Sequence, residues 1–202
     1  MKNQENQNVN SENSLEKSKN KIFEKFTVKD IVFMAIISAV ALCTAAVMAI
    51  VSHIYIFGLA QLVTGLQFSL FPAVALMKIR KPGTLFIFAF LTGLFELFMA
   101  PVMFFSSILT GLILEILVIL IFRGYKSNTA IFFASWLFIP ATLPFNLLYY
   151  RLFSKELWDL FFGSGFKILA VVFVVGTFAV CALGAFLGIK ISKELKKAGV
   201  LK

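Results

Sequence analysis

The sequence predicts an all-α integral membrane protein, a compact bundle of six transmembrane helices with both termini in the cytoplasm. First, 60% of the 202 residues are hydrophobic and only 14% are charged, as is typical of polytopic membrane proteins. Second, residues 85–122 contain no Lys or Arg, and their only charged side chains are Glu96 and Glu115. Pro101 divides this stretch into two segments of roughly twenty residues, each long enough at ~1.5 Å per residue to cross ~30 Å of hydrocarbon. Third, the basic residues gather at the ends of the apolar segments.

The amino-terminal segment is polar. Residues 1–20 consist almost wholly of Asn, Gln, Glu, Ser and Lys, which cannot bury a core, so we expect a disordered tail. Residues 21–30 place Ile22, Phe23 and Phe26 on one helical face among lysines. This pattern predicts a short amphipathic segment at the membrane surface.

Span one, residues 31–51, carries two rows of alanines spaced four residues apart. One row is Ala35 and Ala39, and the other is Ala41, Ala45 and Ala49. A four-residue spacing puts each row on one helical face, where small side chains let another helix approach closely. The rows favour either packing within the bundle or docking to another membrane subunit.

Five further spans follow. They are predicted at residues 58–77, 84–99, 102–122, 129–150 and 167–189, and residues 191–202 form a basic tail. Pro140 and Pro144 lack backbone N–H groups, so span five is expected to be kinked or locally unwound. Between spans five and six, residues 154–162 predict a short amphipathic surface helix with Trp158 as an interfacial anchor.

The Lys and Arg residues predict the orientation. All but three of the 19 lie in the amino-terminal segment, in the turns at residues 78–83 and 123–126, or near the carboxyl terminus. The three on the opposite side are Arg151, Lys155 and Lys167. Because basic residues concentrate on the cytoplasmic side, both termini are predicted to be cytoplasmic, in a membrane that we expect to be the bacterial plasma membrane. The position of these residues at span ends argues against a nucleic-acid partner, despite a net charge of +9.

Several functional classes lack the residues that they require. His53 is the only histidine, and Cys43 and Cys181 lie in different predicted spans, so we expect no metal site and no cofactor. No Walker A, HExxH or GxSxG motif occurs, so we expect neither enzymatic activity nor ATP hydrolysis by this chain.

Polar side chains within the spans mark the candidate site, because a carboxylate at membrane depth usually has a partner or a function. Glu96 lies near the outer end of span three, roughly 5 Å below the surface, whereas Glu115 lies roughly 20 Å deep. The two acids are therefore too far apart to share a proton or an ion. The predicted substrate-binding residues, all in the outer half, are Glu96, Asn146, Tyr149, Tyr150 and Gln61. Such a set suits a small, planar or cationic solute.

Three of the polar residues have other possible roles. Tyr149 and Tyr150 are equally compatible with the aromatic belt at the membrane interface. Glu115 is expected to bond a Ser, a Thr or a backbone group as a structural or coupling element. Trp136 is a further polar side chain in a span, and its role is left open.

Three stretches of the sequence resemble the substrate-binding (S) components of energy-coupling-factor (ECF) transporters, in particular the hydroxymethylpyrimidine/thiamine type. They are Ile79-Arg80-Lys81-Pro82-Gly83, Glu96 in TGLFE thirteen residues after Gly83, and Gly111-Leu112-x-x-Glu115. The resemblance implies a protein that binds a vitamin or its precursor and works with a membrane coupling subunit and two cytoplasmic ATPase subunits. It also implies that the interface with the coupling subunit is the small-residue face of Ala35, Ala39, Ala41 and Ala45.

Three alternatives stay open. The 25 Phe residues are compatible with an S component for a larger apolar ligand such as a tetrapyrrole. A self-sufficient carrier coupled to protons through Glu115 would usually show an inverted repeat, and none is detectable. A membrane scaffold or assembly factor would explain the spans but would leave Glu96 and the outer polar cluster without a function.

Overall fold

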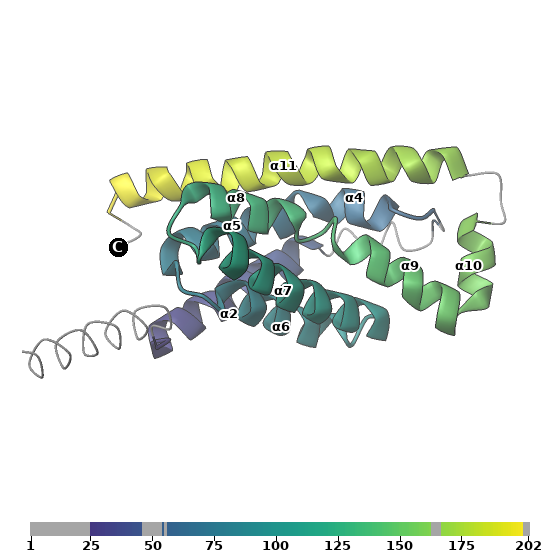
Figure 1. Ribbon diagram of the computed structural model, residues 1–202, viewed down its shortest axis with the longest axis horizontal. Helices are drawn as coiled ribbons and strands as arrows, with labels where there is room; N and C mark the ends of the chain where they lie inside the picture. Colours follow the sequence, from purple (N-terminus) through teal and green to yellow (C-terminus); the bar gives the residue numbers. More distant parts are fainter. Residues whose placement is uncertain (1–24, 46–53, 55, 163–166, 200–202) are drawn as a thin grey trace, which may run out of the picture.

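The computed structural model describes residues 25–45, 54, 56–162 and 167–199, and the regular elements among them are helices. They are α2 (Val28–Thr44), α4 (Leu59–Gly65), α5 (Gln67–Ile79), α6 (Thr84–Glu96), α7 (Pro101–Phe122), α8 (Asn128–Leu137), α9 (Thr142–Phe153), α10 (Lys155–Phe162) and α11 (Lys167–Lys197). Figure 1 shows α11 along the whole length of the bundle, with α10 crossing one end. The predictions for residues 1–24, for Ala49 and for His53 lie outside the described residues.

The chain is an all-helical, multi-pass membrane protein, as the composition predicts. Three stretches of the described residues are long and apolar enough to span a bilayer: Pro101–Phe122, Asn128–Phe153 and Ile168–Lys197. A fourth arises if α4 and α5, which meet at a 42° bend, form one broken span. With 17 and 13 residues, α2 and α6 are shorter than the roughly twenty residues of a full span. The number of six spans and the cytoplasmic side of the termini therefore stay predictions.

Prolines lie close to both interruptions of the long spans. The break between α8 and α9 falls at residues 138–141, which include Pro140, so the predicted disruption of span five is confirmed. The bend between α4 and α5 lies at Leu66, less than two turns before Pro72, whose nitrogen cannot donate to the carbonyl four residues earlier. This second bend was not expected from the sequence.

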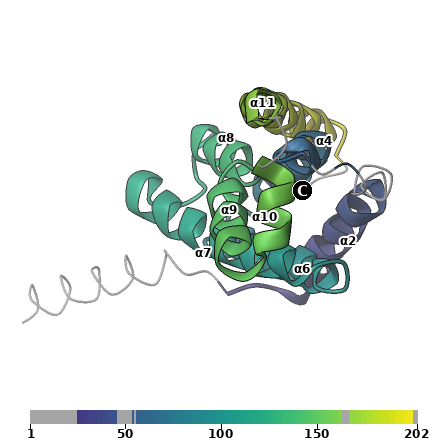
Figure 2. The same cartoon turned by 90° about the vertical axis from the view of Figure 1, so that its right-hand side faces the viewer.

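Helix α5 is the centre of the bundle. Nine of its 13 residues are buried, and it contacts α2, α6, α8 and α11. In the end-on view of Figure 2, α2, α6, α7, α8 and α11 lie around the periphery. Gly184 and Gly188 let α11 lie directly on α5, since a Cβ at Gly188 would come within 2.6 Å of the Leu70 carbonyl oxygen.

Helices α6 and α7 form a closely packed hairpin. A Cβ at Gly111 of α7 would overlap the Cβ of Ala89, so only a glycine allows the two helices to approach at this level. One turn further along α7, the Glu115 carboxylate accepts hydrogen bonds from the backbone N–H groups of Gly83 at 2.6 Å, Leu85 at 3.1 Å and Phe86 at 3.3 Å. Amide groups in the first turn of a helix have no partner within the helix. A side chain of α7 therefore caps α6.

Tyr125 completes this cap from the turn after α7. Its buried hydroxyl donates to Glu115 Oε2 at 3.0 Å. Burial, and after it the charge of Glu115, raise the pKa of Tyr125 well above its usual range, so the hydroxyl keeps its proton and remains a donor. Glu115 is only 5% exposed, and its four donors replace the water that it loses.

One end of the bundle, here called the basic end, joins segments that are far apart in the sequence. It comprises residues 25–30, 78–83, 123–128 and 190–197. Arg80 Nη2 donates to Asn128 Oδ1 at 2.8 Å, and Lys196 Nζ donates to the carbonyl of Met77 at 2.7 Å. Helix α11 therefore extends beyond the end predicted for span six, since its last turn reaches back to α5.

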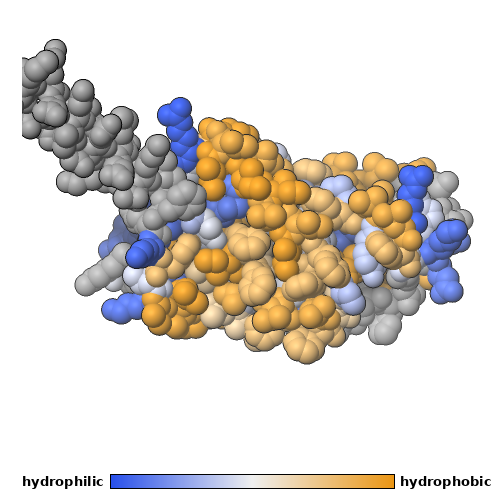
Figure 3. All heavy atoms as spheres, turned by 60° about the horizontal axis from the view of Figure 1, so that its bottom comes forward, coloured by the Kyte–Doolittle hydropathy of each residue, from blue (hydrophilic) through white to orange (hydrophobic). Residues whose placement is uncertain are grey.

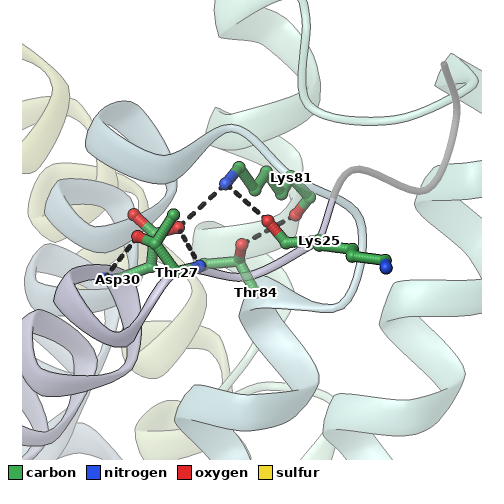
Figure 4. Close-up of polar contacts among 5 residues, drawn as sticks. All are labelled: Lys25, Thr27, Asp30, Lys81 and Thr84. Atoms are coloured by element: carbon green, nitrogen blue, oxygen red, sulfur yellow. Dashed lines mark hydrogen bonds and ion pairs between the residues drawn. The ribbon is translucent and has the colours of Figure 1, made fainter.

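The start of α2 is attached to the turn between α5 and α6. Figure 4 shows Lys81 Nζ bonded to Asp30 Oδ2 at 2.8 Å and to the carbonyl of Lys25 at 3.0 Å. Asp30 also accepts from the Thr27 N–H, and Thr27 Oγ1 accepts from the Asp30 N–H, which is a capping box at the start of α2. One carboxylate therefore both caps α2 and holds it against the bundle.

The outer surface between the two ends is apolar. Figure 3 shows a broad hydrophobic band across the middle of one face, with hydrophilic side chains towards its ends. Exposed side chains such as Ile36 on α2, Leu120 on α7 and Val175 on α11 are more than half accessible. So many apolar side chains around a bundle indicate contact with lipid.

Replacing Gly111 with Ala should push α6 and α7 apart and lower the free energy of unfolding by about 1–3 kcal/mol, a typical cost of overpacking. Thermal unfolding in detergent micelles measures the change. Gly93→Ala is the matched control on the partner helix, because its new Cβ would lie at ordinary distances of 3.5 Å or more from its neighbours. Equal losses in both variants would contradict the packing argument.

Replacing Glu115 with Ala should be more damaging, since three amides and the Tyr125 hydroxyl would then be buried without a partner. We expect a loss of about 3 kcal/mol or more, against about 1 kcal/mol for Tyr125→Phe, which removes a single hydrogen bond. Unfolding in the same micelles compares the two variants. If both lost equal stability, the cap would contribute little.

Candidate functional site

A pocket lies at the end of α6 that is remote from the basic end. It is enclosed by the last turn of α2, by α4, by the α6–α7 turn and by the first turns of α7 and α9. Its described lining residues are Leu42, Ala45, Ala60, Gln61, Thr64, Phe68, Glu96, Met99, Met103, Ser106, Ser107, Ile139, Thr142 and Asn146. The cavity volume is about 70 Å³, whereas sites for drug-sized ligands usually measure ~300–1,000 Å³. A vitamin-sized ligand therefore requires movement of the lining, for which the flexible Met99 and Met103 are suited.

Glu96 is the only acidic side chain among the described lining residues. It is the last residue of α6, and its partly buried carboxylate accepts a hydrogen bond from Ser107 Oγ at 2.5 Å. Its backbone carbonyl accepts from Met99 and Ala100, which closes the tight turn into α7 at Pro101. The α6–α7 hairpin thus positions the carboxylate, whose Oε2 is bonded to Ser107, at the wall of the pocket.

Asn146 contributes the second polar group. It is only 5% exposed, and its Oδ1 has no hydrogen-bond partner among the described residues. In contrast, the hydroxyls of Thr64 and Ser106 donate to carbonyls of their own helices, and that of Thr142 donates to the carbonyl of Ile139 just before α9, all at 2.7–2.8 Å. An unpaired amide oxygen that lines the same pocket as a carboxylate suits a ligand that carries hydrogen-bond donors or a positive charge.

The structure brings together three of the five predicted substrate-binding residues. Glu96, Gln61 and Asn146 line the pocket, although they come from α6, α4 and α9. Tyr149 and Tyr150 are not among its lining residues. The Tyr150 ring lies 5.0 Å from that of Phe161 on α10, and Tyr149 lies 5.3 Å from Phe153, so both belong to an aromatic cluster further along α9.

The four alanines predicted as a single interface differ in their positions. Ala35 and Ala39 are exposed, Ala41 is fully buried in the core, and Ala45 is partly buried and lines the pocket. The reason is the 3.6-residue period of the helix, which turns residue 41 by roughly 120° from residue 35 and by roughly 160° from residue 39 around α2. Only the Ala35–Ala39 row, with exposed Cys43 one turn further on, faces outward.

The other two polar residues hold helices together. Trp136 Nε1 on α8 donates to the carbonyl of Phe178 on α11 at 2.8 Å. Glu115 caps α6 near the basic end, far along α7 from Glu96 and Ser107. Buried Cys181 lies against Gly65, whose missing side chain accommodates its sulfur. Within the described residues, no group of three His, Cys, Asp or Glu side chains is placed to hold a metal ion.

Sequence reasoning missed most of the α7 contribution to the pocket. Ser106 and Ser107 form a polar pair early in a mostly apolar span, ten and eleven residues after Glu96. Two adjacent hydroxyls just after the turn could have indicated this contact. A short hairpin brings residues that precede and follow its turn to the same depth in the bundle. Met99 and Met103 carried no comparable signal.

Comparison with known proteins identifies the fold. A crystal structure of an S component of an ECF transporter matches with a TM-score of 0.56 and 22% sequence identity, over 88% of this chain and 89% of the other. No family model and no curated protein matches the sequence. The chain therefore has the fold of an ECF-transporter S component.

Proposed function

We propose that this protein is the substrate-capture subunit of an ECF-type importer. Two independent lines support the proposal: the overall fold, and a pocket at one end of the bundle that holds a carboxylate and an unpaired amide. The single observation that carries it is the convergence of Glu96 and Asn146 on one cavity from helices that are distant in the sequence. A purely structural bundle would gain no stability from leaving Asn146 Oδ1 buried without a partner.

The ligand that we propose is a vitamin or vitamin precursor of the thiamine or hydroxymethylpyrimidine type. Its amino or cationic group would bind Glu96, its hydrogen-bond donors would meet Asn146 Oδ1, and the methionines would cover its ring. The mixture of hydroxyl, amide and carboxylate groups is less suited to a tetrapyrrole, for which a wider and more apolar cavity is required.

Delivery would depend on a membrane coupling subunit and on two cytoplasmic ATPase subunits that hydrolyse ATP. We propose the exposed row of Ala35 and Ala39 on α2 as the docking surface, because small side chains let a partner helix approach closely. The basic end would face the cytoplasm. A proton-coupled carrier is less favoured, because the carboxylate that it would use, Glu115, is held by three amides at the start of α6 and by the Tyr125 hydroxyl.

The Glu96 proposal is tested by Glu96→Gln, which should weaken the binding of thiamine or hydroxymethylpyrimidine at least tenfold. A charged hydrogen bond contributes about 1.5–3 kcal/mol, and ~1.4 kcal/mol corresponds to tenfold in affinity. Calorimetry measures the affinity, and native mass spectrometry of the purified chain reveals any retained molecule. Glu156→Gln, at an exposed position on α10, is the control. Unchanged affinity in Glu96→Gln, or a native protein that binds neither probe and retains no molecule, would refute the proposal.

The docking proposal is tested by the double variant Ala35→Leu and Ala39→Leu. The bulkier side chains should abolish co-purification with the coupling subunit while leaving ligand affinity within twofold, since neither alanine lines the pocket. Ala179→Leu, an equally conservative change at an exposed position on α11, is the matched control and should leave assembly intact. Normal assembly of the double variant would show that partners dock elsewhere.

A further inference from the structure

Four polar side chains near the pocket have an atom that is buried and without a hydrogen-bond partner in the described part of the chain. They are Ser38 on α2, Gln67 on α5, Thr110 on α7 and Ser135 on α8, here called the deep polar layer. Ser38, Thr110 and Ser135 are completely inaccessible. Leaving such groups unpaired lowers stability, so each requires an explanation.

Each member of the layer lies one helical turn from a residue that lines the pocket. The pairs, lining residue first, are Leu42 and Ser38, Thr64 and Gln67, Ser106 and Thr110, and Ile139 and Ser135. Residues three or four apart share one face of a helix, as in the first and third pairs. The bend at Leu66 falls within the second pair, and in the fourth pair Ile139 lies just past the end of α8. Ser38 and Thr110 therefore continue the pocket-facing sides of α2 and α7, and Gln67 and Ser135 lie one turn along the chain from the lining on α5 and α8.

In all four pairs, the direction from the lining residue to the layer residue is towards the basic end. Helices α2 and α8 start at the basic end, and in each the layer residue precedes the lining residue. Helices α5 and α7 end at the basic end, and in each the layer residue follows the lining residue. The layer therefore lies between the pocket and the basic end, and Figure 1 shows the directions in which these helices run.

Other buried hydroxyls in the bundle have hydrogen-bond partners within their own helices. Thr92, Thr177 and Ser192 each donate to the carbonyl four residues earlier in their own helix, at 2.7–2.9 Å. The hydroxyls of the deep polar layer make no such bond. The remaining unpaired groups have other surroundings: Ser69 lies beside Gly184 of α11, and Arg80 belongs to the basic end.

Building on the proposed function, we propose that the pocket extends inward into the deep polar layer, which forms a second subsite for the uncharged end of a polar solute. Hydroxyl and amide groups donate and accept hydrogen bonds but carry no charge, so they match a hydroxyl, an amide or an aminopyrimidine edge. Glu96, one turn or more above, holds the cationic or donor-rich end. The ligand class is thus an elongated solute with one charged or donor-rich end and one neutral hydrogen-bonding end.

The test measures access to the layer without requiring the identity of the ligand. In a background with Cys43→Ala and Cys181→Ala, single variants Thr110→Cys and Ser135→Cys are treated with the cationic reagent 2-aminoethyl methanethiosulfonate. This reagent modifies a thiolate that water can reach, and mass spectrometry follows the added mass. Thr177→Cys is the matched control, since Thr177 is equally buried but bonds its own helix on α11. Asn146→Cys reports on the pocket itself.

We expect modification at positions 110 and 135 at least tenfold faster than at position 177. Rates at both positions equal to the control would overturn the subsite, and Ser38→Cys replaces either variant that fails to elute as a folded monomer. Rapid modification at position 146 with none at 110 and 135 would leave the proposed capture function standing and refute only the subsite. Absence of modification at position 146 as well would count against both, because the pocket would then be closed to solutes.

Discussion

The cap that Glu115 places on α6 is the interaction on which the rest of the structure depends. A carboxylate in a bilayer lowers stability unless several donors surround it, and the N-cap Gly83 and the first turn of α6 supply three amides that no side chain of the N-cap satisfies. The Glu115 carboxylate therefore gains the hydrogen-bond donors that it needs, and the free amides of α6 gain an acceptor. Because α6 is short, fixing its start also fixes the level of Glu96 at its other end.

The two ends of the bundle differ in the kind of bond that holds them. At the basic end, side chains of Lys81, Arg80 and Lys196 connect segments up to 119 residues apart. At the pocket end, most hydroxyls bond their own helices, and Asn146 Oδ1 has no partner in the described residues. The basic end is thus held together by hydrogen bonds between distant segments. The pocket end has polar groups without partners in the described residues and is lined by flexible methionines. This division suits a protein that must hold its helices in place and still admit a solute.

Part of the candidate site could be predicted from the sequence, and the predicted residues that lie away from the pocket do so for one reason. Glu96, Gln61 and Asn146 stood out because polar groups in apolar spans need partners, and depth along each span placed them at one level. Tyr149 and Tyr150 are at nearly the same depth, but depth does not report which neighbour a side chain meets. They pack with Phe153 and Phe161, since α10 folds back beside α9. Ala41 shares the spacing of its neighbours but lies on the inner side of α2.

The sequence by itself determined the helical membrane class, the approximate limits of the helices and the gathering of basic residues at alternate turns. These properties follow from the composition and the hydrophobic periodicity of single segments, and they do not depend on how the segments pack together. Only the tertiary structure decided that Glu115 caps α6, that Ser107 meets Glu96, and that four unpaired polar groups form a layer below the pocket. Each of these depends on the rotation and the level of one helix against another, which side-chain packing sets across distances that no single segment encodes.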